Sequence, residues 1–221
     1  MMKNKIRAIV LLGFATAAIG ITACAGVNSQ SRQDPDKTMA QNHEGMNHSG
    51  MNHNMDVGPA DANYDLRFID SMIPHHQGAL VMAQEVLQKS KRPEVIKLSQ
   101  GIIREQKKEI AQMQQWRKKW YPKVSATPVM WHAEMNHEMA MTPAHKQMMM
   151  MSMSLGAADA GFDKRFLDAM IPHHQGAVTM GKDLAQKSKR PEMQKLAKNI
   201  VSSQQKEIDM MNQWRKQWYQ K

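Results

Sequence analysis

A gapless internal repeat constrains this chain more than any other feature of its sequence. Residues 65–121 align with residues 163–219 at an offset of 98, and about 34 of the 57 positions are identical. The phrase MIPHHQGA, which begins at Met72, recurs letter for letter from Met170. This repeat predicts two copies of one supersecondary unit that pack against each other, because one such unit cannot bury its apolar surface alone.

Each copy is predicted to form two helices joined by a short turn. In the first copy, apolar residues recur at spacings of three and four on both sides of the sequence KSKRPE. The basic residues of that sequence suit the end of a helix, and Pro93 suits the first turn of the next one. Pro74 is expected to bend the first helix or to break it near its start. The hairpins, assigned to residues 63–121 and 163–221, predict an all-α four-helix bundle.

The rest of the chain differs in composition from the two hairpins. Residues 1–23 have the basic start and short apolar run of a signal peptide, and the sequence ITAC, which ends at Cys24, resembles a bacterial lipobox. An ordinary signal peptide followed by a chance cysteine is the alternative. Residues 24–62 and 122–162 are rich in Met, His and small polar residues, so we expect disordered segments that bury no core.

Methionine content and charge are the two unusual features of the composition. The chain has 23 Met but only 4 Phe and 3 Tyr, and its formal net charge is +10. A basic chain can bind nucleic acid, but no nucleic-acid-binding motif accompanies the charge, and a solvated lysine-rich helix surface accounts for it. We therefore predict no nucleic-acid partner. Because Cys24 is the one cysteine, packing or metal must hold the protein together without an intrachain disulfide.

The two histidines of each phrase are the first candidate ligands. On a helical wheel, His75 and Met82 border the face that carries His76, and polar and thioether groups of the second helix can turn toward them. We predict a Cu(I) site in each copy, between its two helices. The candidates are His75, His76, Met82, Gln106, Glu109 and Met113, with His173, His174, Met180, Gln204, Glu207 and Met211 in the second copy. Alternatively, one histidine of each pair only hydrogen-bonds to Glu109 or Glu207 and holds the bundle together.

The Met/His-rich segments supply a second group of candidates. Thioether and imidazole groups without a thiolate select soft Cu(I), for which Ag(I) is a chemical mimic. The methionines of these segments have no predicted core to fill, although low-complexity drift would give a similar composition. The candidates are His43, Met46, His48, Met51, His53 and Met55 in the first segment, and Met135, His137, Met139 and Met141 in the second.

The sequences FIDSMIPHHQGALVMA and QKKEIAQMQQW, with their counterparts in the second copy, resemble a known family, domain of unknown function number 305. The chain resembles two tandem copies of the family motif. This resemblance implies an exported bacterial protein with a ferritin-like helical fold, and CopM-type members of the family are copper-binding resistance proteins. It also implies a role for Asp70 beside the bundle candidates. The chain departs from the pattern at Glu105, whose counterpart is Ser203.

The sequence thus predicts a lipid-anchored protein of the periplasm or cell envelope that binds Cu(I), and Ag(I) in its place. Its predicted role is to buffer copper or deliver it to an efflux or oxidase partner, without enzymatic activity. One alternative is a ferritin-like di-iron oxidase, which needs Glu-x-x-His on two helices. That spacing occurs only from Glu134 to His137. The other alternative is a structural envelope protein whose histidine pairs are merely packed.

Lipidation at Cys24 can be tested directly. We expect Cys24→Ala to release soluble protein or to leave the precursor uncleaved, because the lipobox cysteine is both the cleavage and the attachment site. Mass spectrometry of the native N-terminus measures the modification. An unmodified N-terminus at another residue would contradict the prediction.

Overall fold

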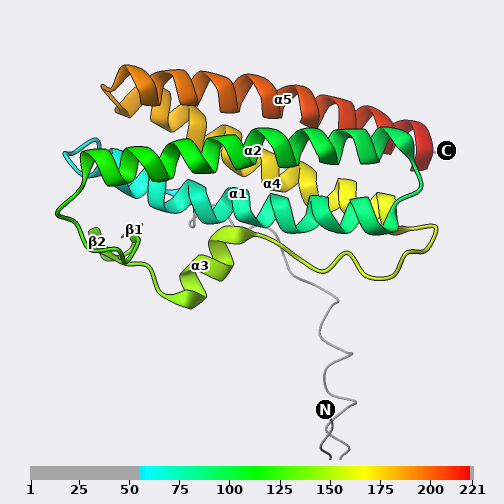
Figure 1. Ribbon diagram of the computed structural model, residues 1–221, viewed down its shortest axis with the longest axis horizontal. Coiled ribbons are helices and arrows are strands. Elements are labelled where there is room, and N and C mark those ends of the chain that lie inside the picture. The colour runs from blue at the N-terminus through cyan, green and yellow to red at the C-terminus, as the bar shows by residue number, and fades with distance from the viewer. Residues whose placement is uncertain (1–54, 220–221) are drawn as a thin grey trace, which may run out of the picture. The chain divides into compact units, whose positions relative to one another are not determined.

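Four long helices dominate the structure, a computed structural model that describes residues 55–219 (Figure 1). The helices are α1 (Tyr64–Lys89), α2 (Pro93–Trp120), α4 (Phe162–Lys187) and α5 (Pro191–Tyr219). α1 packs against α2, α4 packs against α5, and α1 also contacts α4. No helix within residues 55–219 is long and apolar enough to cross a membrane. The predicted all-α bundle is confirmed.

Prolines occur both at the starts of helices and inside them. Pro93 and Pro191 begin α2 and α5, where the missing N–H costs nothing because first-turn N–H groups have no acceptor within the helix. Pro74 and Pro172 lie inside α1 and α4, which continue on both sides. The expected break at Pro74 therefore does not occur. The neighbouring His75 is fully buried, so tertiary packing holds this part of α1 in place.

The connection between the two hairpins is ordered, which corrects the prediction that residues 122–162 are disordered. It contains strands β1 (Val129–His132) and β2 (His137–Ala140) and the short helix α3 (Pro143–Met150). The strands pair antiparallel, with His132 opposite His137. Composition misled the prediction because four isolated apolar side chains still become buried, without any branched aliphatic run. These are Met130, Met141, Met149 and Leu155.

Each repeat begins before its first helix, earlier than the predicted boundaries at 63 and 163. Val57 and Leu155 occupy equivalent positions and are both 1% exposed. The Arg67 guanidinium donates hydrogen bonds to the carbonyl oxygens of Val57 and Pro59, both at 2.8 Å. Arg165 makes the equivalent two bonds in the second repeat, at 2.6 and 2.7 Å. Residues 57–62 thus belong to the folded unit and not to a disordered segment.

A glycine sets the turn at both of these repeat starts. Gly58 and Gly156 have φ values of 85° and 76°, in the left-handed region that favours glycine. The surrounding sequences VGPADA and LGAADA align at the same offset as the helices. The sequence therefore carries a signal for the longer repeat, which the Met/His-rich composition nearby obscures.

Two reciprocal clamps join the repeats at the ends of the helices. In each clamp an arginine lies 3.1–3.2 Å from an aspartate of the other repeat. The same guanidinium lies 4.3–4.5 Å from the ring centroid of a tryptophan, which suits a cation–π contact. The members are Arg92, Asp163 and Trp218 in one clamp, and Arg190, Asp65 and Trp120 in the other. All three pairs are related by the 98-residue offset, so the two repeats contact each other in equivalent ways.

The glycine of the first phrase is a point of close backbone approach. The Met150 carbonyl group, at the end of α3, occupies the space that a Cβ atom on Gly78 would need. Gly101, in α2, has no neighbouring atom within 4 Å of its equivalent position. Both glycines lie in helices, but a Cβ atom would clash at Gly78 and would fit at Gly101.

We expect Gly78→Ala to destabilise the protein by roughly 1–3 kcal/mol, because a Cβ atom must displace the Met150 backbone. The matched control Gly101→Ala should instead stabilise it by roughly 0.5–1 kcal/mol, the helix-propensity gain of alanine over glycine. Urea unfolding measures both free energies. Equal effects of the two substitutions would contradict the close approach of α3 to α1.

Candidate metal-binding site

The four histidines of the two phrases meet in the interior of the bundle. His75, His76, His173 and His174 are all 0% exposed. The rings of His75 and His173 contact each other across the repeats, with centroids 3.9 Å apart and planes tilted by 41°. We call His75 and His173 the inner pair, and His76 and His174 the outer pair. The inner pair brings one ligand candidate from each repeat to the same point.

Each outer histidine binds a carboxylate of its own repeat. His76 Nε2 lies 2.8 Å from Glu109 Oε2, and His174 Nε2 lies 2.7 Å from Glu207 Oε2. A neutral imidazole whose Nε2–H donates to a carboxylate has its lone pair on Nδ1. The Nδ1 atoms of both outer histidines are buried without a hydrogen-bond partner. Carboxylates commonly orient metal-binding histidines in this way.

The inner pair is uncharged and also has free lone pairs. Burial lowers the pKa of His75 well below its usual value of 6.5, and the neighbouring His173, His76 and His174 lower it further. Burial, with His174 and His76, lowers the pKa of His173 to about 3. His173 Nε2 lies 3.1 Å from the Met150 carbonyl oxygen and donates to it, which leaves Nδ1 without a partner. Within the described part of the chain, His75 has no hydrogen-bond partner on either ring nitrogen.

Both Met/His-rich segments reach the inner pair. The Met55 Sδ atom and the His75 Nε2 atom lie 3.4 Å and 3.2 Å from the position that a Cβ atom on Gly176 would take. The glycine of the second phrase therefore makes room for a thioether and an imidazole. Met150, within the methionine run at 148–151 of the second segment, contacts His173 through its backbone carbonyl oxygen.

The buried methionines are arranged differently from the prediction of one ligand set in each copy. Met113 packs in one apolar cluster with Met180, whereas Met82 packs in a second cluster with Met211. Met82 and Met113, which we predicted to face each other in one copy, thus pack in different clusters, because the contact between α1 and α4 brings thioethers of different repeats into each cluster. All four methionines are fully buried.

The remaining bundle candidates are two glutamines and an aspartate. Gln106 and Gln204 are 3% exposed, and buried amide atoms of both have no partner. Asp70 instead has a structural role. Its carboxylate accepts hydrogen bonds from Arg117 Nε at 2.5 Å and from the Val129 N–H at 2.9 Å, and so fixes β1 to α1.

The other candidate ligands of the Met/His-rich segments do not lie at the inner pair. Met135 is 66% exposed at the tip of the β-hairpin, His137 is exposed, Met139 is half-buried and Met141 is buried. His43, Met46, His48, Met51, His53 and the lipidation candidate Cys24 lie outside the described residues.

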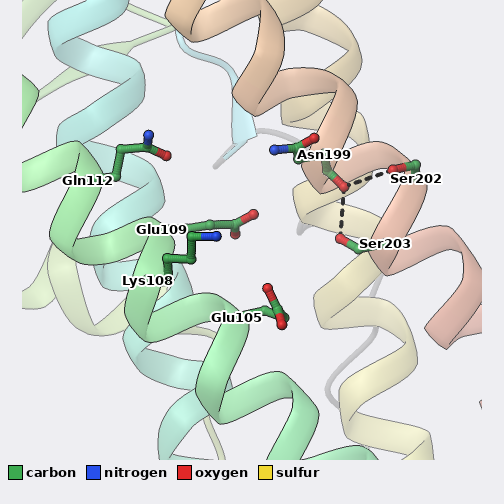
Figure 2. A pocket seen from close by; sticks show the side chains of 7 residues that line it. All are labelled: Glu105, Lys108, Glu109, Gln112, Asn199, Ser202 and Ser203. Carbon is green, nitrogen blue, oxygen red and sulfur yellow. Dashed lines mark hydrogen bonds between the residues drawn. The ribbon is translucent and has the colours of Figure 1, made fainter.

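A groove between α2 and α5 leads toward the outer histidine of the first repeat (Figure 2). Its lining residues are Glu105, Lys108, Glu109, Gln112, Asn199, Ser202 and Ser203. In Figure 2, the carboxylates of Glu105 and Glu109 extend from α2 into the space opposite α5. Because Glu109 also contacts His76, it connects the solvent to the buried histidines. Glu105 and its counterpart Ser203 both line this groove, so the repeats differ at its centre.

The fold and the site define a class of protein: a helical bundle with a buried cluster of histidines and nearby methionines. The family described as "Domain of unknown function (DUF305)" matches residues 65–215 in a single stretch. The chain belongs to this family.

Solved structures of a relative cover the same bundle. CopM in the Cu(I)-bound form is 39% identical, with a TM-score of 0.55, and the match covers 70% of this chain and 97% of that chain. CopM in the Cu(II)-bound form is 41% identical and in the Ag-bound form, obtained by soaking, 37% identical, both with TM-scores of 0.56 and the same coverage. Uncharacterized protein L153 of Acanthamoeba polyphaga mimivirus is 48% identical over 50 residues, which are 23% of this chain and 33% of that protein.

The lowered pKa values of the inner pair predict acid-sensitive stability of the metal-free protein. The unfolded chain takes up protons at these histidines as the pH falls below about 6.5, whereas the folded chain does not. Stability is therefore lost as the pH falls, by about 1.4 kcal/mol per pH unit for each inner histidine well below pH 6.5. Urea unfolding between pH 7 and pH 4 measures this slope. In the His75→Leu, His173→Leu variant it should become shallower, and an unchanged slope would contradict the assignment.

Proposed function

We propose that this protein binds Cu(I), with Ag(I) as a chemical substitute, at a centre formed by the inner histidines where the two repeats meet. The observation that carries this proposal is His75. It is fully buried, and neither ring nitrogen has a partner among residues 55–219. The Met55 sulfur and His75 Nε2 lie within 3.4 Å of the same point beside Gly176. A buried polar group without a hydrogen bond is costly, so a cation that takes up these lone pairs would stabilise the folded state.

The donor chemistry favours a soft monovalent cation. Imidazole and thioether are neutral ligands, and together they suit Cu(I) better than a hard cation. Burial also matters, because the cost of taking an ion out of water rises steeply with its charge, and uncharged ligands compensate little of it. The carboxylates of Glu109 and Glu207, which contact the outer histidines, would orient those rings and offset part of the cation's charge.

The relatives support the same metal. The CopM structures, at 37–41% identity, are of Cu(I)-, Cu(II)- and Ag-bound forms, and the match covers 97% of the CopM chain. The equivalent contacts made by the two repeats support the further proposal that the family unit arose by duplication of one hairpin.

In the cell we propose an exported protein that is lipid-anchored at Cys24 and buffers copper or hands it to an efflux or oxidase partner. The His and Met residues of the segment before Met55 would then act as weak collecting sites for the metal. The role includes no enzymatic step.

Two other functions have less support. A di-iron oxidase needs a carboxylate-rich cluster, and residues 55–219 contain no group of three or more His, Cys, Asp or Glu side chains suited to a metal. Simple packing accounts for the outer histidines, which have carboxylate partners. It does not account for His75, whose two ring nitrogens gain nothing from their surroundings.

We expect one tight Cu(I) equivalent at the bundle, shared by the repeats, because each repeat contributes one inner histidine. This replaces the expectation of one site in each copy. Anaerobic titration against a competing chelator measures it. The His75→Leu, His173→Leu variant should lose that equivalent. Met55→Leu should weaken it at least tenfold, because orienting groups alone are worth about 10- to 100-fold and a direct ligand should be worth no less.

Met193→Leu is the matched control for the loss of a thioether. Met193 is fully buried, and its counterpart in the first repeat is Val95, so the symmetric arrangement needs no sulfur there. This variant should bind as the wild type does. Retention of the tight equivalent in the double histidine variant would show that the inner pair only packs.

A further inference from the structure

The β-hairpin carries a second cluster of nitrogen and sulfur ligands, far along the chain from the inner pair. His132 and His137 are directly opposite each other in the β1–β2 register. Their rings are stacked nearly parallel, at an interplanar angle of 8° and a centroid separation of 6.0 Å. Residues two apart on a strand share a face, so the neighbouring pair, Met130 and Met139, lies on the same face as the two histidines.

We propose that this face of the hairpin is a separate binding site for one soft monovalent cation, held by His132 and His137 with the Met139 thioether as third ligand. This site does not depend on the proposed centre at the inner pair. It differs from isolated His and Met side chains of the Met/His-rich segments because its two imidazoles bind the same ion as a chelate.

The separation of the two rings fits this role. An ion bound to two imidazoles needs the nitrogen atoms about 4 Å apart, since each metal–nitrogen bond is about 2.0 Å, as for zinc. The ring centroids lie 6.0 Å apart, so a small inward turn of the side chains brings the nitrogens within reach. His137 is exposed and His132 is half-buried, which allows an ion to enter from solvent.

The hydrogen bonds of the two rings leave His137 Nε2 free to bind a metal, whereas His132 Nε2 must first lose its proton. His137 Nδ1–H donates to the Glu138 carbonyl oxygen at 2.9 Å, so its Nε2 carries the lone pair. His132 Nδ1 accepts from the Met135 N–H at 3.2 Å, so its proton is on Nε2. Binding through both Nε2 atoms moves that proton to Nδ1 and releases the Met135 N–H to water. The Met135 amide therefore reports on occupation of the site.

Contacts with α1 hold the β1–β2 hairpin in place. Arg67, only 1% exposed, pairs with Glu138 at 3.1 Å and lies 5.1 Å from the centroid of the Trp131 ring. The Asp70 carboxylate holds the Val129 N–H. Trp131 on β1 and Glu138 on β2, each next to a histidine, are thus fixed to α1. Because the hairpin is already ordered, metal binding costs little conformational entropy.

Ag(I) added to the full-length protein is a suitable probe, because it resists air oxidation. Nitrogen-15 spectra of uniformly labelled protein should show the His132 and His137 ring signals changing together at the same Ag(I) concentration, along with the Met135 amide. His132→Phe should weaken the response of His137 by roughly 100-fold, the low end of the gain from linked ligands. His137→Phe should do the same to His132, and the double variant should lose one equivalent.

Two controls make the result decisive. The phenylalanine variants keep an aromatic cross-strand pair in the β-hairpin. An unchanged circular dichroism spectrum would confirm that these variants remain folded. In the His75→Leu, His173→Leu background the hairpin response should persist, so failure of the inner centre and failure of this site are separate outcomes. If His132 and His137 respond at different Ag(I) concentrations, or if His137 responds normally in His132→Phe, the rings only stack and the proposal is overturned.

Discussion

The contact between His75 and His173 is the constraint around which the bundle is arranged. Two uncharged imidazoles lie against each other at the crossing of α1 and α4, where water cannot satisfy their nitrogens. Such a contact is tolerated only if the surroundings hold it, because unpaired buried polar groups weaken a fold. The glycines of the two phrases are part of that arrangement. Gly78 admits the Met150 carbonyl group, and Gly176 admits Met55 and the His75 ring.

Neither repeat can bury its inner histidine and its apolar surface without the other. Each hairpin alone would leave its half of the inner pair and one side of each apolar cluster exposed to water. The arginine clamps at the helix ends are partly exposed, so their ion pairs add little stability, but they define how far one hairpin slides along the other. An error in that register would separate the two phrases. The clamps therefore have a direct consequence for the site.

The two repeats differ where the connecting segment docks. Asp70 is 2% exposed, accepts from Arg117 and holds β1. Its counterpart Asp168 is 38% exposed and pairs with Lys164 on its own helix and, at 3.6 Å, with Arg215, the counterpart of Arg117. Glu105 and Ser203 differ at the opposite surface, in the groove beside Glu109. These two differences lie where the repeats meet different segments of the chain, while the histidines, their carboxylates and the phrase glycines are the same in both repeats.

The helices, the repeat and the residue types that meet inside the bundle follow from the sequence alone. Helical periodicity, the prolines at helix starts and the partnership of His76 with Glu109 depend on residues that are near one another on one hairpin. The remaining features depend on packing between the hairpins. Tertiary structure paired His75 with His173, put Met82 and Met113 in different clusters and ordered residues 122–162 through scattered buried methionines. These outcomes depend on how α1 and α4 are rotated and crossed, and a periodic pattern along one helix does not specify its orientation toward another.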